Sequence, residues 1–192
     1  VADCISPYIP FSHIGSLLNY LPDSNELIWY SERSDWAHLY RYDLNNGELK
    51  NAITEGDWLV RNILRYDHQR RELWIQTAGR YPDRNPYYSD ICRVNIDTGE
   101  LVEVQSSDHD YAVCSPTGRF GFGMASTGVS ANGQYIVTKR STVNQIPVSI
   151  LFDRHGKECL TLEKADISGL PDQWQWPESV KLKAADNKTE LW

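Results

Sequence analysis

A serine between two glycines is the first arrangement in this chain that could carry chemistry. In a G-x-S-x-G motif the serine lies on a strained turn between a strand and a helix, where a histidine can activate it as a nucleophile. The segment Gly128-Val-Ser-Ala-Asn-Gly133 has its second glycine one residue too late, and a strand-like Tyr-Ile-Val run follows it. The serine of Gly123-Met-Ala-Ser-Thr-Gly128 is also displaced by one residue. We interpret both segments as glycine turns.

The Asp108-His-Asp110 triplet has the composition of an acid–base cluster. It lies where we expect one strand unit to hand over to the next, a position rich in turn residues, so we interpret it as a turn. None of the five histidines lies in an H-E-x-x-H motif or at metal-ligand spacing from another. The other four are His13, His38, His68 and His155, and we interpret His38 as a structural histidine within a strand.

The four cysteines, Cys4, Cys92, Cys114 and Cys159, include no C-x-x-C pair, which argues against zinc and thioredoxin-type chemistry. We expect Cys92 and Cys159 to be free thiols in the core. Disulfide bonds stay possible if the compartment is oxidising. No glycine-rich phosphate cradle is present in the sequence. We therefore assign no catalytic, cofactor-binding or metal-binding residue to this chain, and we expect no cofactor.

Seven tryptophans could indicate stacking against sugars. Trp29, Trp58 and Trp74 lie in or beside strand-like runs, where packing in a core explains them more simply. Trp174 and Trp176 lie close to Pro177 near the end of the chain, and both interpretations stay open for them.

The length of 192 residues fits one domain, or part of a larger one. A net charge of −7 argues against nucleic acid and anionic membrane surfaces as partners. No apolar run approaches the roughly 20 residues that span a bilayer. The chain opens at Val1 without a methionine and stops at Trp192 within a strand-like pattern, so we expect a piece of a longer protein.

The elements that would position any site follow a repeat. A strand runs to an aspartate and then to a turn with glycine, at Ala37–Gly47, Ile91–Gly99 and Val148–Gly156. The glycines Gly47, Gly99 and Gly156 are spaced by 52 and 57 residues. A unit recurring at such a period indicates a repeat architecture, and because every unit reads as strands the repeat predicts propeller blades.

We therefore predict an all-β fold, a partial β-propeller of about three four-stranded antiparallel blades cut from a larger ring. The blades are expected at 15–52, 58–105 and 110–163, within a propeller region 1–165 that contains a glycine-rich insertion at 119–130. Residues 166–192 are expected to form a connecting segment. It would hold one helical turn at 166–170, capped by Asp166, and a strand at 180–184.

Four segments of the chain resemble the amino-terminal propeller of dipeptidyl peptidase IV-like enzymes, in the prolyl oligopeptidase superfamily of serine peptidases. Residues 31–43 are similar to the family's S-E-R-x-G-W-x-H-L-Y-x-Y-D hairpin, and residues 53–60 to its L-T-x-G-x-W-x-V segment. Residues 85–95 are similar to N-P-x-x-R-H-L-Y-R-V-N, with Ser89-Asp90 in place of Arg-His and Cys92 in place of Tyr. Residues 162–170, 176–178 and 183–186 resemble the run from propeller to hydrolase.

The resemblance implies an eight-bladed propeller that caps an α/β-hydrolase domain and controls the access of peptides to it. It also implies a periplasmic or extracellular parent enzyme that removes dipeptides from peptide amino termini. The family's catalytic Ser, Asp and His lie in the hydrolase domain, and no Glu-Glu pair that would grip a substrate amino terminus occurs here. The chain alone is thus expected to be inactive, with its own hydrolase domain and the parent's peptide substrates as partners.

Two other functions stay open at this point. The same blades could form a protein-binding module with no peptidase role, and a parent without a hydrolase domain would favour it. A small propeller glycosidase would need two carboxylates across a cleft, and the 26 acidic residues offer no way to choose them. An incomplete ring leaves two stacking faces uncovered, so we also expect self-association through exposed blade faces.

Overall fold

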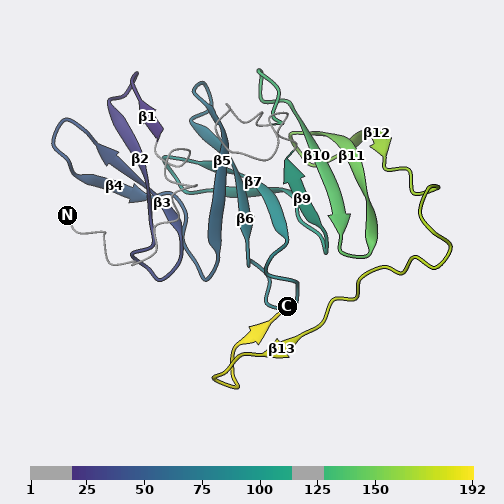
Figure 1. The fold of residues 1–192 in the computed structure, drawn as a ribbon. Coiled ribbons are helices and arrows are strands. Elements are labelled where there is room, and N and C mark those ends of the chain that lie inside the picture. Colours follow the sequence, from purple (N-terminus) through teal and green to yellow (C-terminus); the bar gives the residue numbers. More distant parts are fainter. Residues whose placement is uncertain (1–18, 114–127) are drawn as a thin grey trace.

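The structure, a computed structural model, describes residues 19–113 and 128–192 (Figure 1). Within these ranges the chain forms strands and no helix, in three four-stranded antiparallel sheets and one two-stranded hairpin. Each large sheet pairs its strands in sequence order, as a meander. The prediction of an all-β fold with three four-stranded antiparallel units is confirmed.

The strands have the following bounds. The first sheet contains β1 (Asn19–Leu21), β2 (Glu26–Ser31), β3 (His38–Asp43) and β4 (Leu49–Ala52). The second contains β5 (Leu59–Asp67), β6 (Glu72–Ala78), β7 (Ser89–Asn95) and β8 (Leu101–Gln105). The third contains β9 (Asp110–Val113), β10 (Tyr135–Thr142), β11 (Gln145–Asp153) and β12 (Glu158–Lys164). The hairpin consists of β13 (Leu182–Lys183) and β14 (Glu190–Leu191).

The repeated turn after the third strand of each sheet has one physical cause. The side-chain oxygen of the strand-ending residue accepts a hydrogen bond from the backbone N–H two residues on, at 2.8–2.9 Å for Asp43, Asn95 and Asp153. Such a side chain takes the place of a backbone turn, and the glycine that follows has positive φ. In the second sheet this capping residue is Asn95, whereas the sequence repeat predicts a strand that ends at Asp97.

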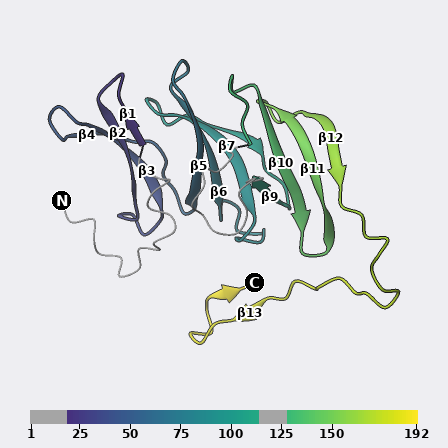
Figure 2. The same ribbon diagram turned by 45° about the horizontal axis from the view of Figure 1, so that its top comes forward.

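The three sheets stack face to face along the chain (Figure 2). One apolar core lies between the first and second sheets and includes Ile28, Leu39, Leu73 and Ile75. Another lies between the second and third sheets and includes Trp74, Ile91, Ile136 and Ile150. Leu73, Trp74 and Ile75 are 0% exposed, so β6 is buried on both faces, as its unbroken apolar run predicts.

A buried ion cluster joins the first sheet to the second at one end of β2. Glu26 is 2% exposed and accepts hydrogen bonds from Lys50 at 2.6 Å and from Arg71 at 2.7 Å. Arg71 comes from the second sheet and also bonds Asp97, which in turn contacts Arg41. Burial would raise the pKa of Glu26, but the hydrogen bonds from Lys50, Arg71 and Ser24 outweigh it and lower the pKa to about 2.

A second cluster repeats this arrangement between the second and third sheets. Glu72 accepts a hydrogen bond from Arg93 of its own sheet at 2.6 Å and from Arg154 of the third sheet at 2.9 Å. Arg93 also donates to the backbone oxygen of Arg154 at 3.0 Å. Each internal seam therefore carries a glutamate that is held by a guanidinium from the following sheet.

Near the other end of the third strand, the first and second sheets use different chemistry. His38, five residues before Asp43, contacts Thr54 Oγ1 through Nδ1 at 3.0 Å and the Gly56 carbonyl through Nε2 at 2.8 Å. Burial lowers the pKa of His38, so the imidazole is neutral there.

Asp90, five residues before Asn95, takes the corresponding place in the second sheet. It accepts a hydrogen bond from Arg84 at 2.6 Å, and burial raises the pKa of this carboxyl despite that arginine. Arg84 also donates to Ser106 at 3.0 Å, in the segment that leads to the third sheet. In both sheets a polar residue near the start of the third strand is thus tied to the segment that leads to the next sheet. The first sheet uses a neutral imidazole for this contact, and the second sheet uses a buried ion pair.

Several expectations about local structure need correction. Asp166 accepts the N–H of Ser168 at 2.8 Å, but the segment is an isolated turn rather than a helical turn, because no run of helical hydrogen bonds follows it. The strand expected at 180–184 is reduced to β13, which pairs with only two residues of β14. Trp29 is 38% exposed, because it points away from the second sheet. Its assignment to the core was therefore wrong. Most of the 119–130 insertion lies outside the described residues.

The seam between the second and third sheets can be tested at Gly156. This residue has φ +83°, and a Cβ atom there would lie 2.1 Å from the backbone oxygen of Val104 in the neighbouring sheet. Gly47 has φ +75° with nothing within 4 Å of a Cβ, so it is the matched control. We expect Gly47→Ala to cost about 1 kcal/mol from backbone strain alone, and Gly156→Ala about 3 kcal/mol, by urea unfolding. Equal losses for the two variants would contradict the close approach of the sheets.

The ion cluster around Glu26 predicts an acid-sensitive contribution to stability. Because the folded-state pKa lies below the ordinary value of 4.5, the contribution is present above pH 4.5 and is lost as the pH falls toward about 2. Glu26→Gln should lower the free energy of unfolding at pH 7 by about 3 kcal/mol and should flatten the pH dependence in that window. Glu100→Gln, at an exposed turn position, is the control. If Glu26→Gln kept the pH dependence of the unsubstituted chain, the acid-sensitive contribution would not come from Glu26.

Candidate functional site

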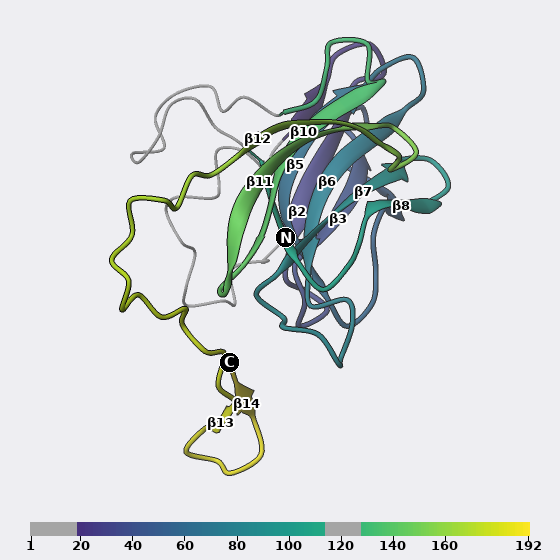
Figure 3. The same cartoon turned by 90° about the vertical axis from the view of Figure 1, so that its right-hand side faces the viewer.

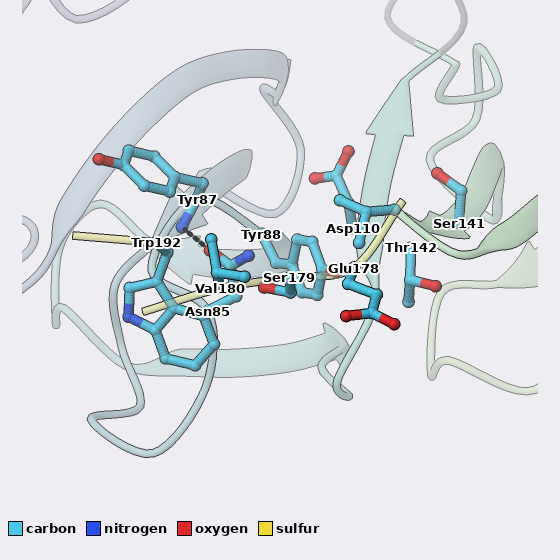
Figure 4. Close-up of a pocket in the computed structure, with 11 residues that line it drawn as sticks. Asn85, Tyr87, Tyr88, Asp110, Ser141, Thr142, Glu178, Ser179, Val180 and Trp192 are labelled. Atoms are coloured by element: carbon cyan, nitrogen blue, oxygen red, sulfur yellow. Dashed lines mark hydrogen bonds between the residues drawn. The ribbon is translucent and has the colours of Figure 1, made fainter. Parts of the chain in front are cut away.

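A cavity of about 450 Å³ lies between the second and third sheets and the C-terminal hairpin (Figure 4). Its size is typical of pockets for small ligands. Three aromatic rings line it, from Tyr87, Tyr88 and Trp192, together with the carboxylates of Asp110 and Glu178. The other lining residues are Asn85, Ser141, Thr142, Val143, Ser179 and Val180.

The two tyrosines reach the cavity from the loop between β6 and β7. Pro82 and Pro86 prevent regular strand pairing in this loop. Asn85 then forms a turn, because its Oδ1 accepts the N–H of Tyr87 at 2.9 Å and its backbone oxygen accepts the N–H of Tyr88 at 3.1 Å. The turn brings both residues to the cavity edge, where the ring of Tyr88 lies beside Ser179 and Glu178 (Figure 4).

Asp110 opens β9 and connects two sheets. Its Oδ1 accepts the N–H of Ser89, the first residue of β7, at 2.9 Å. This hydrogen bond leaves the second carboxylate oxygen of Asp110 able to accept from a ligand. Ser141 and Thr142, at the end of β10, place two hydroxyl groups on the same side of the cavity.

The remaining wall comes from the C-terminal segment. Lys183 and Glu190 pair at 3.1 Å across the β13–β14 hairpin, which carries Trp192 to the cavity. The ammonium group of Lys181 lies 3.7 Å from the centre of the Trp192 ring, a cation–π contact that covers one indole face. The described lining contains no Lys, Arg, His or Cys, so the cavity can supply carboxylates, hydroxyl groups and aromatic faces.

His109, the middle residue of the Asp108-His-Asp110 triplet, belongs to a hydrogen-bonded chain beside this cavity. His109 Nδ1 lies 3.0 Å from Ser107 Oγ, and its Nε2 lies 3.2 Å from Gln145 Oε1. Ser107 Oγ also lies 2.8 Å from the hydroxyl of Tyr111. The histidine bonds Ser107 and Gln145, while Asp110 bonds the backbone of Ser89 instead. The chain joins the entry of β9 to the hairpin between β10 and β11.

The other sequence motifs have structural positions. Ser130, from the displaced glycine motif, accepts the N–H groups of Gln134 and Tyr135 at 3.2 and 3.0 Å, as expected for a turn residue. His68 lies in an exposed turn, with Nδ1 3.5 Å from an Asp23 carboxylate oxygen. His155 lies in the exposed turn after β11. Within the described ranges, no group of three or more His, Cys, Asp or Glu side chains could hold a metal ion.

The two cysteines that the structure describes are free but differ in environment. Cys92 is buried, and burial raises the pKa of its thiol to about 11, although Arg80 donates to the sulfur at 3.2 Å. Cys159 is exposed on β12, so its assignment to the core was wrong, because β12 is the last strand of its sheet and has no neighbouring strand beyond it. Cys4 and Cys114 lie outside the described residues, as do His13 and the 123–127 glycine segment.

The cavity is not predictable from the sequence. Tyr87, Asp110 and Trp192 come from three distant segments, and no local spacing records their convergence. In the part of the chain that the structure describes, no helix has the length and apolar character needed to cross a membrane.

A family model, related sequences and solved structures all relate this chain to dipeptidyl peptidase IV proteins. Residues 7–147 match the model of the family described as the dipeptidyl peptidase IV N-terminal region. Dipeptidyl peptidase 4 of Trichophyton equinum is 29% identical over 84 residues, which are 42% of this chain and 11% of that protein. This chain thus spans about a tenth of the length of that relative.

Two solved structures share the fold. A Bacteroides ovatus protein assigned as a dipeptidyl aminopeptidase IV superposes with a TM-score of 0.65 at 24% identity, over 91% of this chain and 25% of that chain. Porphyromonas gingivalis dipeptidyl peptidase 4 superposes with a TM-score of 0.57 at 22% identity, over 77% of this chain and 18% of that chain. At these identities the likeness shows the arrangement of the sheets.

The contacts of Ser107 predict that it is not a nucleophile. An activated serine needs a base whose positive charge is stabilised by a third group, usually a carboxylate, whereas the third group here is the neutral Gln145. Treatment with a fluorophosphonate probe should therefore leave Ser107 unlabelled in intact-mass and peptide mass spectra. A serine hydrolase in the same tube is the control for the probe. Stoichiometric labelling of Ser107 would contradict this interpretation.

Proposed function

Because the chain belongs to the family of the dipeptidyl peptidase IV N-terminal region, we propose that it forms part of a propeller that controls the access of peptides to a separate hydrolase domain. The match of residues 7–147 to that family carries the proposal. The three stacked four-stranded sheets support it, because they are the expected blades. The complete ring would have eight blades, of which this chain supplies three.

The proposed parent is a serine exopeptidase of the periplasm or the extracellular space that removes dipeptides from peptide amino termini. The support is the likeness to relatives named as dipeptidyl peptidases. In this proposal the nucleophile, its base and its orienting carboxylate lie in the hydrolase domain. The three sheets contribute a wall, with no residue that touches the reacting atoms.

The packing of the sheets suits the role of a wall. Each internal seam combines an apolar core with a glutamate held by a guanidinium from the next sheet. Sheets fixed in this way resist separation, so a flexible peptide could pass through an opening of the ring whereas a folded protein could not. Selectivity of this kind depends on the size and flexibility of the substrate and leaves the chemical step unchanged.

The proposal is tested by loosening one seam in the longer protein that carries this chain. Arg154→Ala removes the guanidinium that the third sheet supplies to Glu72. We expect kcat/KM for a Gly-Pro chromogenic substrate to stay within about twofold, because the chemical step does not use this seam. We expect cleavage of a structured polypeptide to rise by about fivefold or more, because the wall is the barrier to that substrate.

Two controls complete this test. Glu100→Gln, at an exposed turn, should change neither rate, and the isolated 192-residue chain should leave the Gly-Pro substrate intact. Turnover by the isolated chain would show that it contains a catalytic site of its own. An equal change for both substrates in Arg154→Ala would show that the seam does not control access.

A further inference from the structure

The cavity between the second and third sheets has walls that indicate a definite ligand chemistry. They come from the β6–β7 loop, the start of β9, the β10–β11 hairpin and the C-terminal segment. Figure 3 shows this last segment leaving β12, running beside the stack of sheets and ending in the β13–β14 hairpin. Because the cavity lies at an internal seam, further blades stacked before the first sheet or after the third would not fill it.

The cavity has an aromatic part and an acidic part. Figure 4 shows the rings of Tyr87 and Trp192 at one end and the carboxylates of Asp110 and Glu178 at the other, with the ring of Tyr88 between them. A ligand that occupies both parts needs an apolar body for the rings and a polar head for the carboxylates.

The acidic part favours a head with a positive charge. Among the described residues neither Asp110 nor Glu178 has an ion-pair partner, and the described lining contains no cationic side chain. An ammonium group would donate charge-assisted hydrogen bonds to these carboxylates. A metal ion fits less well, because within 19–113 and 128–192 no group of three or more His, Cys, Asp or Glu side chains could hold one. The net charge of −7 adds a long-range attraction for cations.

The protein itself places an ammonium group against the aromatic part. Lys181 Nζ lies 3.7 Å from the centre of the Trp192 ring, and this cation–π contact covers one face of the indole. The contact is made by an alkyl stem that ends in an ammonium group. A ligand with the same chemistry could therefore use the other rings of the cavity in the same way.

We propose that this cavity binds a primary ammonium group carried on an apolar or aromatic body. The ammonium group donates to the carboxylates of Asp110 and Glu178, while the body lies against the rings of Tyr87 and Tyr88. The lysine side chain of a peptide and a small aromatic amine share this chemistry. The site goes beyond the proposed control of access, because it needs neither a closed ring nor a hydrolase domain.

Isothermal titration calorimetry on the longer protein that carries this chain tests the proposal with matched probes. Phenethylamine is compared with 2-phenylethanol, and N-acetyl-lysinamide with N-acetyl-norleucinamide. The two probes of each pair have similar apolar bodies and differ in the ammonium group. Each amine should bind at least about tenfold more tightly than its neutral counterpart. The tighter of the two amines then identifies the source as a free aromatic amine or as a lysine side chain.

Charge-neutral variants assign the binding to this cavity. Asp110→Asn and Glu178→Gln should each weaken the binding of the amines at least about fivefold and leave the neutral probes unchanged. Asn at position 110 keeps an oxygen for the N–H of Ser89, so the seam between the sheets should survive. Asp108→Asn removes the same charge from an exposed position outside the cavity lining and is the matched control. Its effect should stay below about twofold.

Lys181→Ala gives a change of the opposite sign. It exposes the covered face of Trp192 and removes a positive charge beside the cavity, so the amines should bind about threefold or more tightly. The hairpin should persist, because Glu190 lies 3.1 Å from Lys183 and 3.9 Å from Lys181. A gain in affinity cannot result from a loss of folding.

Three results overturn the proposal. One is the absence of binding for both amines. Another is equal affinity for an amine and its neutral counterpart, since the cavity would then select no charge. The last is an equal loss in Asp108→Asn and Asp110→Asn, which would indicate general attraction to an acidic surface. A negative outcome of the access test with Arg154→Ala would leave this site unaffected, so the two proposals fail separately.

Discussion

The arrangement of this protein depends on the burial of both faces of its central sheet. Leu73 and Ile75 point toward the first sheet, while Trp74, between them in sequence, points toward the third. A strand that is apolar on both faces is stable only when a neighbour covers each face, because removal of apolar surface from water is the dominant favourable term in folding. The meander of each sheet is local, so the stacking of sheets supplies the long-range order.

Apolar burial alone does not define how one sheet lies on the next, and the two ion clusters add this information. Glu26 and Glu72 each have charged partners in their own sheet and accept one more hydrogen bond from the following sheet, from Arg71 or from Arg154. A shift of one sheet along the other would break this charged hydrogen bond, which costs more than a shift between apolar surfaces. The clusters therefore select one relative position of the sheets from many that bury a similar area.

The repeat, the strands and the family resemblance were visible in the sequence because turns and apolar runs are local signals. The strand-ending Asp43 and Asp153 with their glycines marked the hairpins, although Asn95 and not Asp97 proved to be the capping residue of the second. Trp29 was misplaced because the unbroken apolar run of β2 does not show which face of the sheet has a neighbour. The ion clusters and the cavity were not predictable, since their members meet only after separate sheets have stacked.

The exchange of His38 for Asp90 at equivalent corners makes the response to acid uneven across the molecule. His38 has a lowered pKa, so its contribution to folding is present above the unfolded pKa of about 6.5 and falls away in more acidic solution. Asp90 has a raised pKa, so its protonation on acidification favours the folded form relative to neutral pH. Acidification below about pH 6.5 therefore acts against the His38 contacts of the first sheet, whereas at the equivalent position of the second sheet it favours the folded form.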